Sequence, residues 1–126
     1  MAAEKSFENK IRRYFDDIGA WGVKYFANRN TRSGIPDLLY CYQGQFIAVE
    51  VKAADGKPSP LQLEHQRQIR RAGGICIILY PDQFDDFKDY LMIVKRKGYI
   101  PRNQAYRIQV NFDRDGQEGE KDVGYL

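Results

Sequence analysis

Hydrophobic residues near the start of the chain recur at the spacing of a helix. They lie three or four positions apart, which places their side chains on one helical face. The members of this face are Phe7, Ile11, Tyr14, Phe15 and Ile18. We therefore predict an amphipathic helix that begins after Ser6 as its N-cap and ends at Gly19.

Three segments rich in aromatic and β-branched residues follow, at 21–27, 37–42 and 45–53. This composition and their apolar runs predict strands. Only Gln43 and Gly44 separate the second segment from the third, which is the length of a tight hairpin turn. The second and third strands are therefore expected to pair side by side in antiparallel fashion.

A second helix is predicted after the residues Ser59-Pro60-Leu61-Gln62. They place Ser at the N-cap, Pro at the first helical position and Gln at the third, as in a capping box. The helical pattern continues to about Ala72 and stops at Gly73-Gly74.

The apolar run at 75–80 predicts a strand covered on both faces, a helical pattern spans 84–94, and a last short strand is expected at 106–110. The order αβββαβ with additions predicts an α/β fold, in which helices flank a central mixed sheet. The length of 126 residues suits one domain. We place it at 1–111, followed by an acidic, flexible C-terminal tail at 112–126.

Hydrophobic residues make up 43% of the chain and charged residues 29%, a balance that excludes global disorder. No apolar run approaches the ~20 residues needed to cross a bilayer, and the first residues lack the apolar core of a signal peptide. We therefore expect a cytoplasmic protein with no membrane partner. Cys41 and Cys76 lie in apolar runs and are expected to be reduced thiols that pack like small hydrophobes.

The net charge of +3 is unevenly distributed. Residues 112–126 carry five acids and two basic residues, a charge of −3, so residues 1–111 carry +6. That excess is compatible with a polyanionic partner such as nucleic acid, although an ordinary basic surface explains it equally well.

Two acidic residues occupy positions that the predicted hairpin brings together. A two-residue turn pairs Tyr42 with Gln45, and counting back along both strands pairs Asp37 with Glu50. Residues directly opposite on antiparallel strands have Cβ atoms about 4.5 to 5.5 Å apart and point to the same face. Strand alternation adds Lys52 to that face, while the apolar residues between them point the other way. As a lone pattern, such a group is more often a surface ion pair than a site.

Two neighbouring carboxylates are suited to binding a hard divalent ion. Mg²⁺, for which Mn²⁺ substitutes, is typically held at phosphates by one or two carboxylates and several waters. Such an ion polarises a phosphate and lowers the pKa of a bound water, while Lys52 is placed to orient that water or stabilise developing negative charge. The predicted reaction is phosphodiester hydrolysis.

The same residues carry a resemblance to a known family. Gly34-Ile35-Pro36-Asp37 followed by Glu50-Val51-Lys52 resembles the motif of the PD-(D/E)XK nuclease superfamily, in the version found in the VRR-NUC family. The resemblance covers roughly residues 6–80, and it includes Glu8, the Ser59-x-x-Gln62 pair and Gly73-Gly74.

The resemblance implies a restriction-endonuclease-like fold and a metal held by Asp37, Glu50 and the backbone carbonyl of Val51. It assigns catalysis to Lys52 and draws Glu8 and Gln62 into the site. Small stand-alone members, often from bacteriophages, resemble Holliday-junction resolvases that act as homodimers, whereas the member fused into the Fanconi-anaemia-associated nuclease acts on flaps. The length of this chain is similar to that of the stand-alone type. A two-fold symmetric dimer would supply two identical sites for paired cuts.

Three candidate residues keep an alternative explanation. Glu8 either extends the metal site or only interacts favourably with the dipole of the first helix, and its side is shared with apolar residues that face inward. Gln62 either contacts the site or only completes the capping box. His65, one turn later, either touches DNA or is an exposed helical histidine.

DNA contacts are expected from the polar loop before Asp37, which carries Arg29, Arg32 and Ser33, and from Lys57, although polar loops are often only solvated. Three arginines near the second helix are weaker candidates for DNA contact: Arg67, Arg70 and Arg71. The leading hypothesis is an endonuclease for branched DNA. A flap, restriction-like or exonucleolytic enzyme of the same superfamily remains an alternative, as does a catalytically inactive DNA-binding module.

Overall fold

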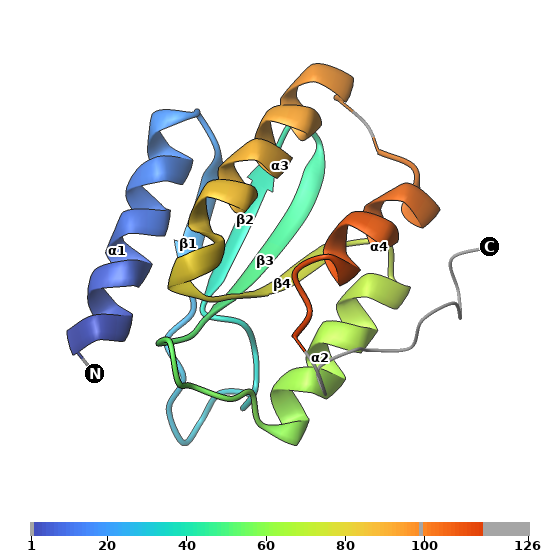
Figure 1. Ribbon diagram of the computed structural model, residues 1–126. Coiled ribbons are helices and arrows are strands. Elements are labelled where there is room, and N and C mark those ends of the chain that lie inside the picture. Colours follow the sequence, from blue (N-terminus) through green and yellow to red (C-terminus); the bar gives the residue numbers. More distant parts are fainter. Residues whose placement is uncertain (1, 99, 115–126) are drawn as a thin grey trace.

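The computed structural model describes residues 2–98 and 100–114, and their helices and strands alternate along the chain (Figure 1). The elements are α1 (Ala2–Asp17), β1 (Trp21–Lys24), β2 (Leu38–Tyr42), β3 (Gln45–Val51), α2 (Pro60–Arg71), β4 (Ile75–Leu79), the 3-10 turn η1 (Pro81–Gln83), α3 (Phe84–Lys97) and α4 (Arg102–Val110). The strands of this described part form one sheet in the order β1-β2-β3-β4. β1 and β3 run antiparallel to β2, whereas β4 runs parallel to β3. The predicted α/β class with a mixed sheet is confirmed.

The hairpin between β2 and β3 has the predicted register. Gln43 and Gly44 both have positive φ, 52° and 77°, as a two-residue type I′ turn requires. Tyr42 therefore pairs with Gln45, and the ladder continues to the pair Leu38 and Val49. Residues 37 and 50 are the next positions beyond this last pair, so they lie next to each other.

One face of the sheet forms the hydrophobic core. The side chains of Ile47, Val49 and Val51 in β3 are fully buried there, as strand alternation predicted. Phe15 of α1 stacks on Tyr40 of β2 with ring centroids 4.0 Å apart and meets Phe87 of α3 edge-on at 5.7 Å. α1 and α3 thus cover this face side by side (Figure 1).

The opposite face is covered only near β4, where α2 packs. Cys76 is buried there, but Trp21 and Phe46 remain 73% and 45% exposed. Cys41, cross-strand neighbour of both, is exposed as well. Both cysteines are free thiols, yet the prediction that Cys41 packs as a buried hydrophobe is wrong because α2 does not reach over β2.

The predicted strand at 106–110 is wrong, because this segment belongs to helix α4. Its buried residues Ala105, Tyr106 and Gln109 follow helical rather than alternating spacing. The predicted boundary of the flexible tail at residue 112 is also wrong for its first residues, since Phe112 is buried and Asp113 pairs with Arg70. The remainder of that tail, 115–126, lies outside the described residues.

Helix α1 begins at Ala2, so Ser6 lies inside the helix and is not its N-cap. The early start has a local cause, because alanine and lysine are good helix formers and Glu4 lies favourably in the first turn. None of the helices in the described ranges is long and apolar enough to cross a membrane.

Candidate active site

Asp37 stands at the junction between the polar loop and β2. The backbone N–H of Tyr25 donates to its carbonyl oxygen over 2.7 Å. Its side chain accepts a 2.8 Å hydrogen bond at Oδ2 from the backbone N–H of Val51. The expected neighbourhood of Asp37 and Glu50 is present, but Asp37 lies just beyond the last ladder pair, and its carboxylate reaches across to the end of β3.

Glu50 is 5% exposed in the interior of an otherwise apolar strand. Its Oε2 accepts a 3.0 Å hydrogen bond from Gln62 Nε2 and lies 3.4 Å from Lys52 Nζ. The predicted convergence of Glu50 and Lys52 is therefore confirmed. Its other oxygen, Oε1, is buried without a hydrogen-bond partner.

Gln62 forms the predicted capping box and also contacts Glu50. Its backbone N–H donates to Ser59 Oγ over 3.1 Å, while its Oε1 accepts from the Ser59 N–H over 2.9 Å. This reciprocal pair is the predicted capping box of α2. The remaining amide group, Nε2, is directed at Glu50. The start of α2 and the orientation of the Glu50 carboxylate thus depend on one side chain.

Glu8 of α1 faces inward, as its side of the helix predicted, and is 4% exposed. Its Oε1 lies 2.7 Å from Nζ of Lys24 on β1, and its Oε2 is buried without a partner. Sequence analysis missed Lys24. The available signal was a lysine within the apolar and aromatic segment 21–27, where a charge calls for a partner.

Burial dominates the electrostatics of the acids. It raises the pKa of Glu50 to about 8, assisted by the neighbouring Asp37 carboxylate and opposed by Lys52. Burial also raises the pKa of Asp37, against the Val51 hydrogen bond and the positive charge of Lys24, with Glu8 adding repulsion. The site therefore contains more negative charge than its own lysines compensate.

The backbone of Val51 completes this arrangement. The Lys52 N–H donates to Leu79 of β4 over 3.0 Å. Because successive peptide groups of a strand alternate sides, the N–H and C=O of Val51 point away from β4. The N–H meets Asp37 on that side, so the carbonyl is directed to the same side of β3.

A divalent cation fits this donor set. Asp37 and Glu50 supply two carboxylates, Val51 a carbonyl, and the unpartnered Glu50 Oε1 is a buried acceptor that lacks a donor. Oxygen donors of this kind suit Mg²⁺ or Mn²⁺. Within residues 2–98 and 100–114, no three His, Cys, Asp or Glu side chains are grouped to hold a metal by themselves. The donor set at this end of β3 therefore comprises the carboxylates of Asp37 and Glu50 and the carbonyl of Val51.

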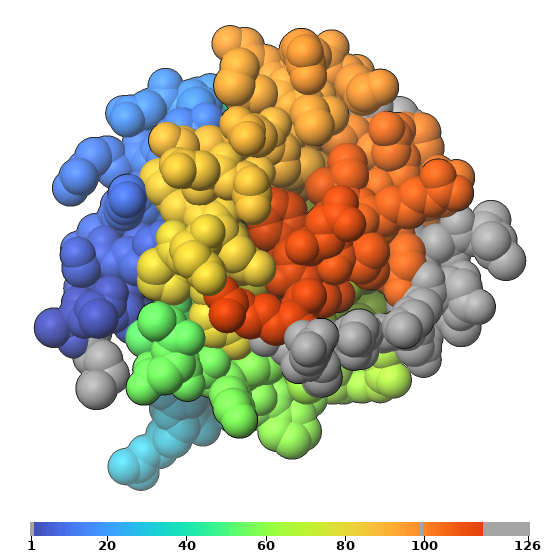
Figure 2. All heavy atoms as spheres, viewed as in Figure 1, coloured from blue at the N-terminus to red at the C-terminus, as the bar shows by residue number. Residues whose placement is uncertain are grey.

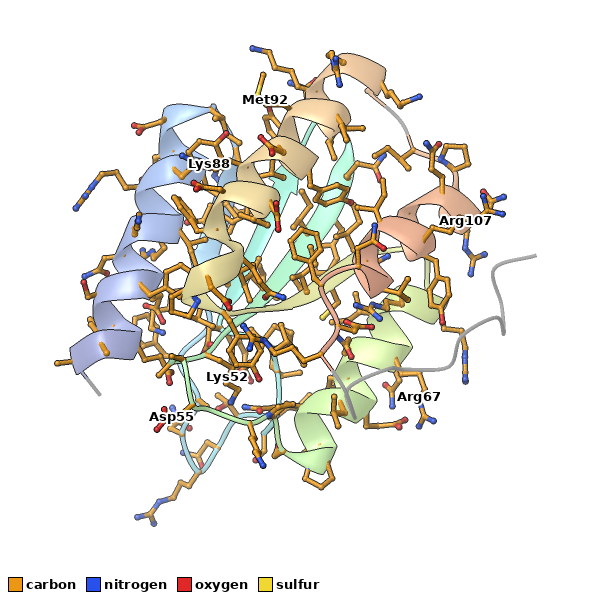
Figure 3. The ribbon with its side chains drawn as sticks, in the orientation of Figure 1. Lys52, Asp55, Arg67, Lys88, Met92 and Arg107 are labelled. Carbon is orange, nitrogen blue, oxygen red and sulfur yellow. The ribbon has the colours of Figure 1, made fainter. Side chains whose placement is uncertain are left out.

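The predicted DNA-contact residues surround the site in different ways. Arg29, Arg32, Ser33 and Lys57 are all exposed. The loop between β1 and β2, with the first three, projects from the body of the molecule beside the segment after β3 (Figure 2). Lys52 lies at the same end of the sheet (Figure 3).

The helix α2 candidates differ from these. Arg70 is 1% exposed and paired with Asp113, so its role as a DNA contact is excluded by burial. Arg67 pairs with Glu64 on the helix surface. His65 is buried instead of exposed, and it packs where a Cβ on Gly34 would lie 3.1 Å from its ring.

A surface pocket of about 420 Å³ lies at the other end of β3, and none of its lining residues is titratable, so it is separate from the acidic cluster. Comparison of the chain with protein-family models, with curated proteins and with solved structures gave no match. The functional argument therefore rests on the geometry of the site and on the sequence motif.

Proposed function

We propose that the chain is a metal-dependent DNA endonuclease whose active site contains Asp37, Glu50 and Lys52. The observation that carries the proposal is the Glu50 carboxylate, which is buried in an apolar strand beside Asp37 and has one oxygen without a partner. Burying such a charge is costly unless a cation or hydrogen bonds compensate it. An unstable arrangement of this kind is typical of functional sites.

The proposed chemistry assigns a separate task to each side chain. Asp37, Glu50 and the Val51 carbonyl would hold Mg²⁺ or Mn²⁺, which when bound polarises the scissile phosphate and acidifies a water. The Lys52 ammonium, held beside Glu50 at 3.4 Å, would stabilise the negative charge that develops on the phosphate oxygens. Gln62 would keep the Glu50 carboxylate in one orientation through its 3.0 Å hydrogen bond.

The order of elements supports a restriction-endonuclease-like core. A helix, an antiparallel three-stranded unit, a helix and a parallel fourth strand follow one another along the chain. The motif residues lie at the end of β3 and at the entrance to β2. Together with the Gly-Ile-Pro-Asp and Glu-Val-Lys segments, this arrangement favours membership of the VRR-NUC family of PD-(D/E)XK nucleases.

We further propose branched DNA as substrate, with Holliday-junction resolution by a homodimer. The projecting loop with Arg29 and Arg32 would bind phosphates beside the site. Two-fold symmetry would provide the two cuts. Cleavage mapping on a labelled four-way junction tests the substrate, because a resolvase gives paired symmetric nicks. Light scattering tests the dimer, and a monomer at working concentration would contradict it.

The catalytic assignment predicts complete loss of cleavage in Asp37→Asn and Glu50→Gln. Each variant keeps the size of the side chain but removes a charge, and we expect a decrease of about 100-fold or more with DNA binding retained. Asp55→Asn is the matched control, because Asp55 is an exposed acid in the loop after β3 (Figure 3). Cleavage rates in Mg²⁺ and gel-shift affinities in Ca²⁺ provide the measurement. Full activity of either site variant would overturn the proposal.

The other candidate activities are separated by the same assay. A flap endonuclease would cut a flap in preference to the junction, a restriction-like enzyme would cut plain duplex at one sequence, and an exonuclease would shorten DNA from its ends. A catalytically inactive DNA-binding module would bind without metal-dependent nicking.

A further inference from the structure

Two carboxylate–ammonium pairs flank Asp37. In one, Glu50 has Oε2 next to Lys52 and Oε1 unpartnered; in the other, Glu8 has Oε1 next to Lys24 and Oε2 unpartnered. The first pair belongs to the proposed catalytic motif. The second pair comes from different elements, α1 and β1, and has no role in the proposed chemistry.

The Lys24 ammonium is held firmly in place. It lies 2.7 Å from Glu8, its side chain is 16% exposed, and it stands 5.4 Å from the ring centroid of Phe26 as a cation–π contact. Lys24 also pairs across the sheet with Leu38, the residue after Asp37. Its positive charge is therefore fixed between the helix that carries Glu8 and the strand that follows Asp37.

A divalent ion next to Glu8 would have to compete with this charge. Lys24 already neutralises Glu8, and a second cation in the same place would be repelled by the ammonium over a short distance of low dielectric. Glu8 is therefore poorly placed to extend the site formed by Asp37 and Glu50.

We propose that Lys24 is a positioning residue that takes the place of a second divalent ion beside Glu8, so that the site binds one ion, at Asp37 and Glu50. This inference rests on the proposed function in assuming that Asp37 and Glu50 bind a metal. It resolves the role of Glu8, which is the counter-charge of Lys24 and becomes a metal ligand only when the Lys24 charge is removed.

The test counts bound Mn²⁺ by electron paramagnetic resonance on the whole protein without DNA. The wild-type chain is expected to bind one Mn²⁺ with the spectrum of an isolated ion. Lys24→Met keeps the length of the side chain but removes its charge, and it should bind two ions with the signature of magnetically coupled Mn²⁺. Lys24→Arg should retain one ion.

Two further variants separate this role from a general structural effect. Lys24→Met combined with Glu8→Gln should return to one ion, because the additional ligand is lost. Lys88→Met is the matched control, since Lys88 also lies over aromatic rings but on α3, against Tyr14 and Phe84. It should bind one ion as the wild type does.

Two ions in the wild-type chain, or one ion in a folded Lys24→Met variant, would overturn the inference. Should Lys24→Met fail to fold, Lys24→Gln removes the same charge with a polar side chain and decides in its place, because it too should bind two ions while Glu8 is present. Failure of the proposed function has a different signature: wild-type protein that binds no Mn²⁺ would contradict the metal site itself, and with it both proposals. Two bound ions together with Glu50-dependent DNA cleavage would contradict only the role of Lys24.

Discussion

Two buried groups of charges contact the two ends of α2, one through Gln62 in its first turn and one through Arg70 in its last, and they differ in how completely their polar atoms are satisfied. Around Arg70, the guanidinium donates to both carboxylate oxygens of Asp113, to Gln109 and to the Cys76 carbonyl, at 2.8–3.1 Å. In the group around Glu50, the carboxylates of Glu50 and Glu8 each have one buried oxygen without a hydrogen-bond donor. The ion pair of Arg70 and Asp113 is therefore closed, whereas the group that contains Glu50 is open, because a carboxylate oxygen in it accepts no hydrogen bond.

The difference separates structural from functional burial of charge. A fully hydrogen-bonded ion pair fixes the position of neighbouring elements, here α2, β4 and α4. An incompletely bonded group destabilises the fold by itself, and acids with perturbed pKa values are common at functional sites. Burial alone therefore does not identify a site; at Glu50 the unpartnered carboxylate oxygen lies beside a second acid, Asp37.

The largest effect is expected at the closed group. Arg70→Met would leave Asp113 buried without its partner, and we expect a loss of about 3 to 5 kcal/mol in the free energy of unfolding. Urea denaturation measures it. Arg107→Met, at an exposed arginine of α4 (Figure 3), is the control and should be near neutral. A similarly small change at Arg70 would remove the distinction between the two groups.

At the open group, which contains Glu50, removal of the charge is expected to raise the free energy of unfolding. In the folded chain the pKa of Glu50 is about 8, compared with an ordinary value of 4.5. A raised pKa in the folded state means that the fold favours the protonated carboxyl of Glu50. The free energy of unfolding is therefore highest below pH 4.5, and it decreases as pH rises from there to about 8. Without divalent ions, Glu50→Gln should therefore be more stable than wild type by roughly 4 kcal/mol at pH 8.

Thermal melts across pH 4–9 in chelator would measure this gain. The two proteins should have similar melting temperatures near pH 4.5 and diverge above it. Equal stability at pH 8 would mean that the Glu50 charge is already compensated in the folded protein.

The smallest effect is expected at Gln62, where it distinguishes the helix cap from the hydrogen bond to Glu50. Ser59→Ala removes the N-cap and should cost about 1 kcal/mol of stability with little change in cleavage. Gln62→Ala should cost a similar amount of stability and also reduce cleavage several-fold, because Glu50 loses a hydrogen bond. Chemical denaturation and single-turnover rates measure both quantities. Identical effects of both substitutions on cleavage would assign Gln62 to the helix cap alone.

The local features of the site were predictable because short-range rules determine them. A two-residue turn sets the register that brings residue 37 to residue 50, and a capping box starts α2 where the pattern Ser-Pro-Leu-Gln predicts. Strand alternation then places Lys52 beside Glu50.

Features that depend on distant partners were not predictable. Arg70 and Asp113 are separated by 43 positions, so Arg70 was considered a DNA contact and Asp113 part of a flexible tail. The segment 106–110 has apolar residues at every second position, which imitates a strand, although α4 is set by its packing against β4. Lys24 became visible as part of the site only when β1 was placed next to α1.

The double use of Gln62 has a consequence for how such a protein evolves. One side chain sets the start of a helix and the direction of the Glu50 carboxylate, so selection for stability and selection for activity act on the same codon. A lineage that abandons cleavage is therefore free to lose Glu50 and still has reason to keep Gln62. Under the proposed function, a descendant of this chain that keeps Gln62 but has lost Glu50 would be a nuclease that became a binding protein.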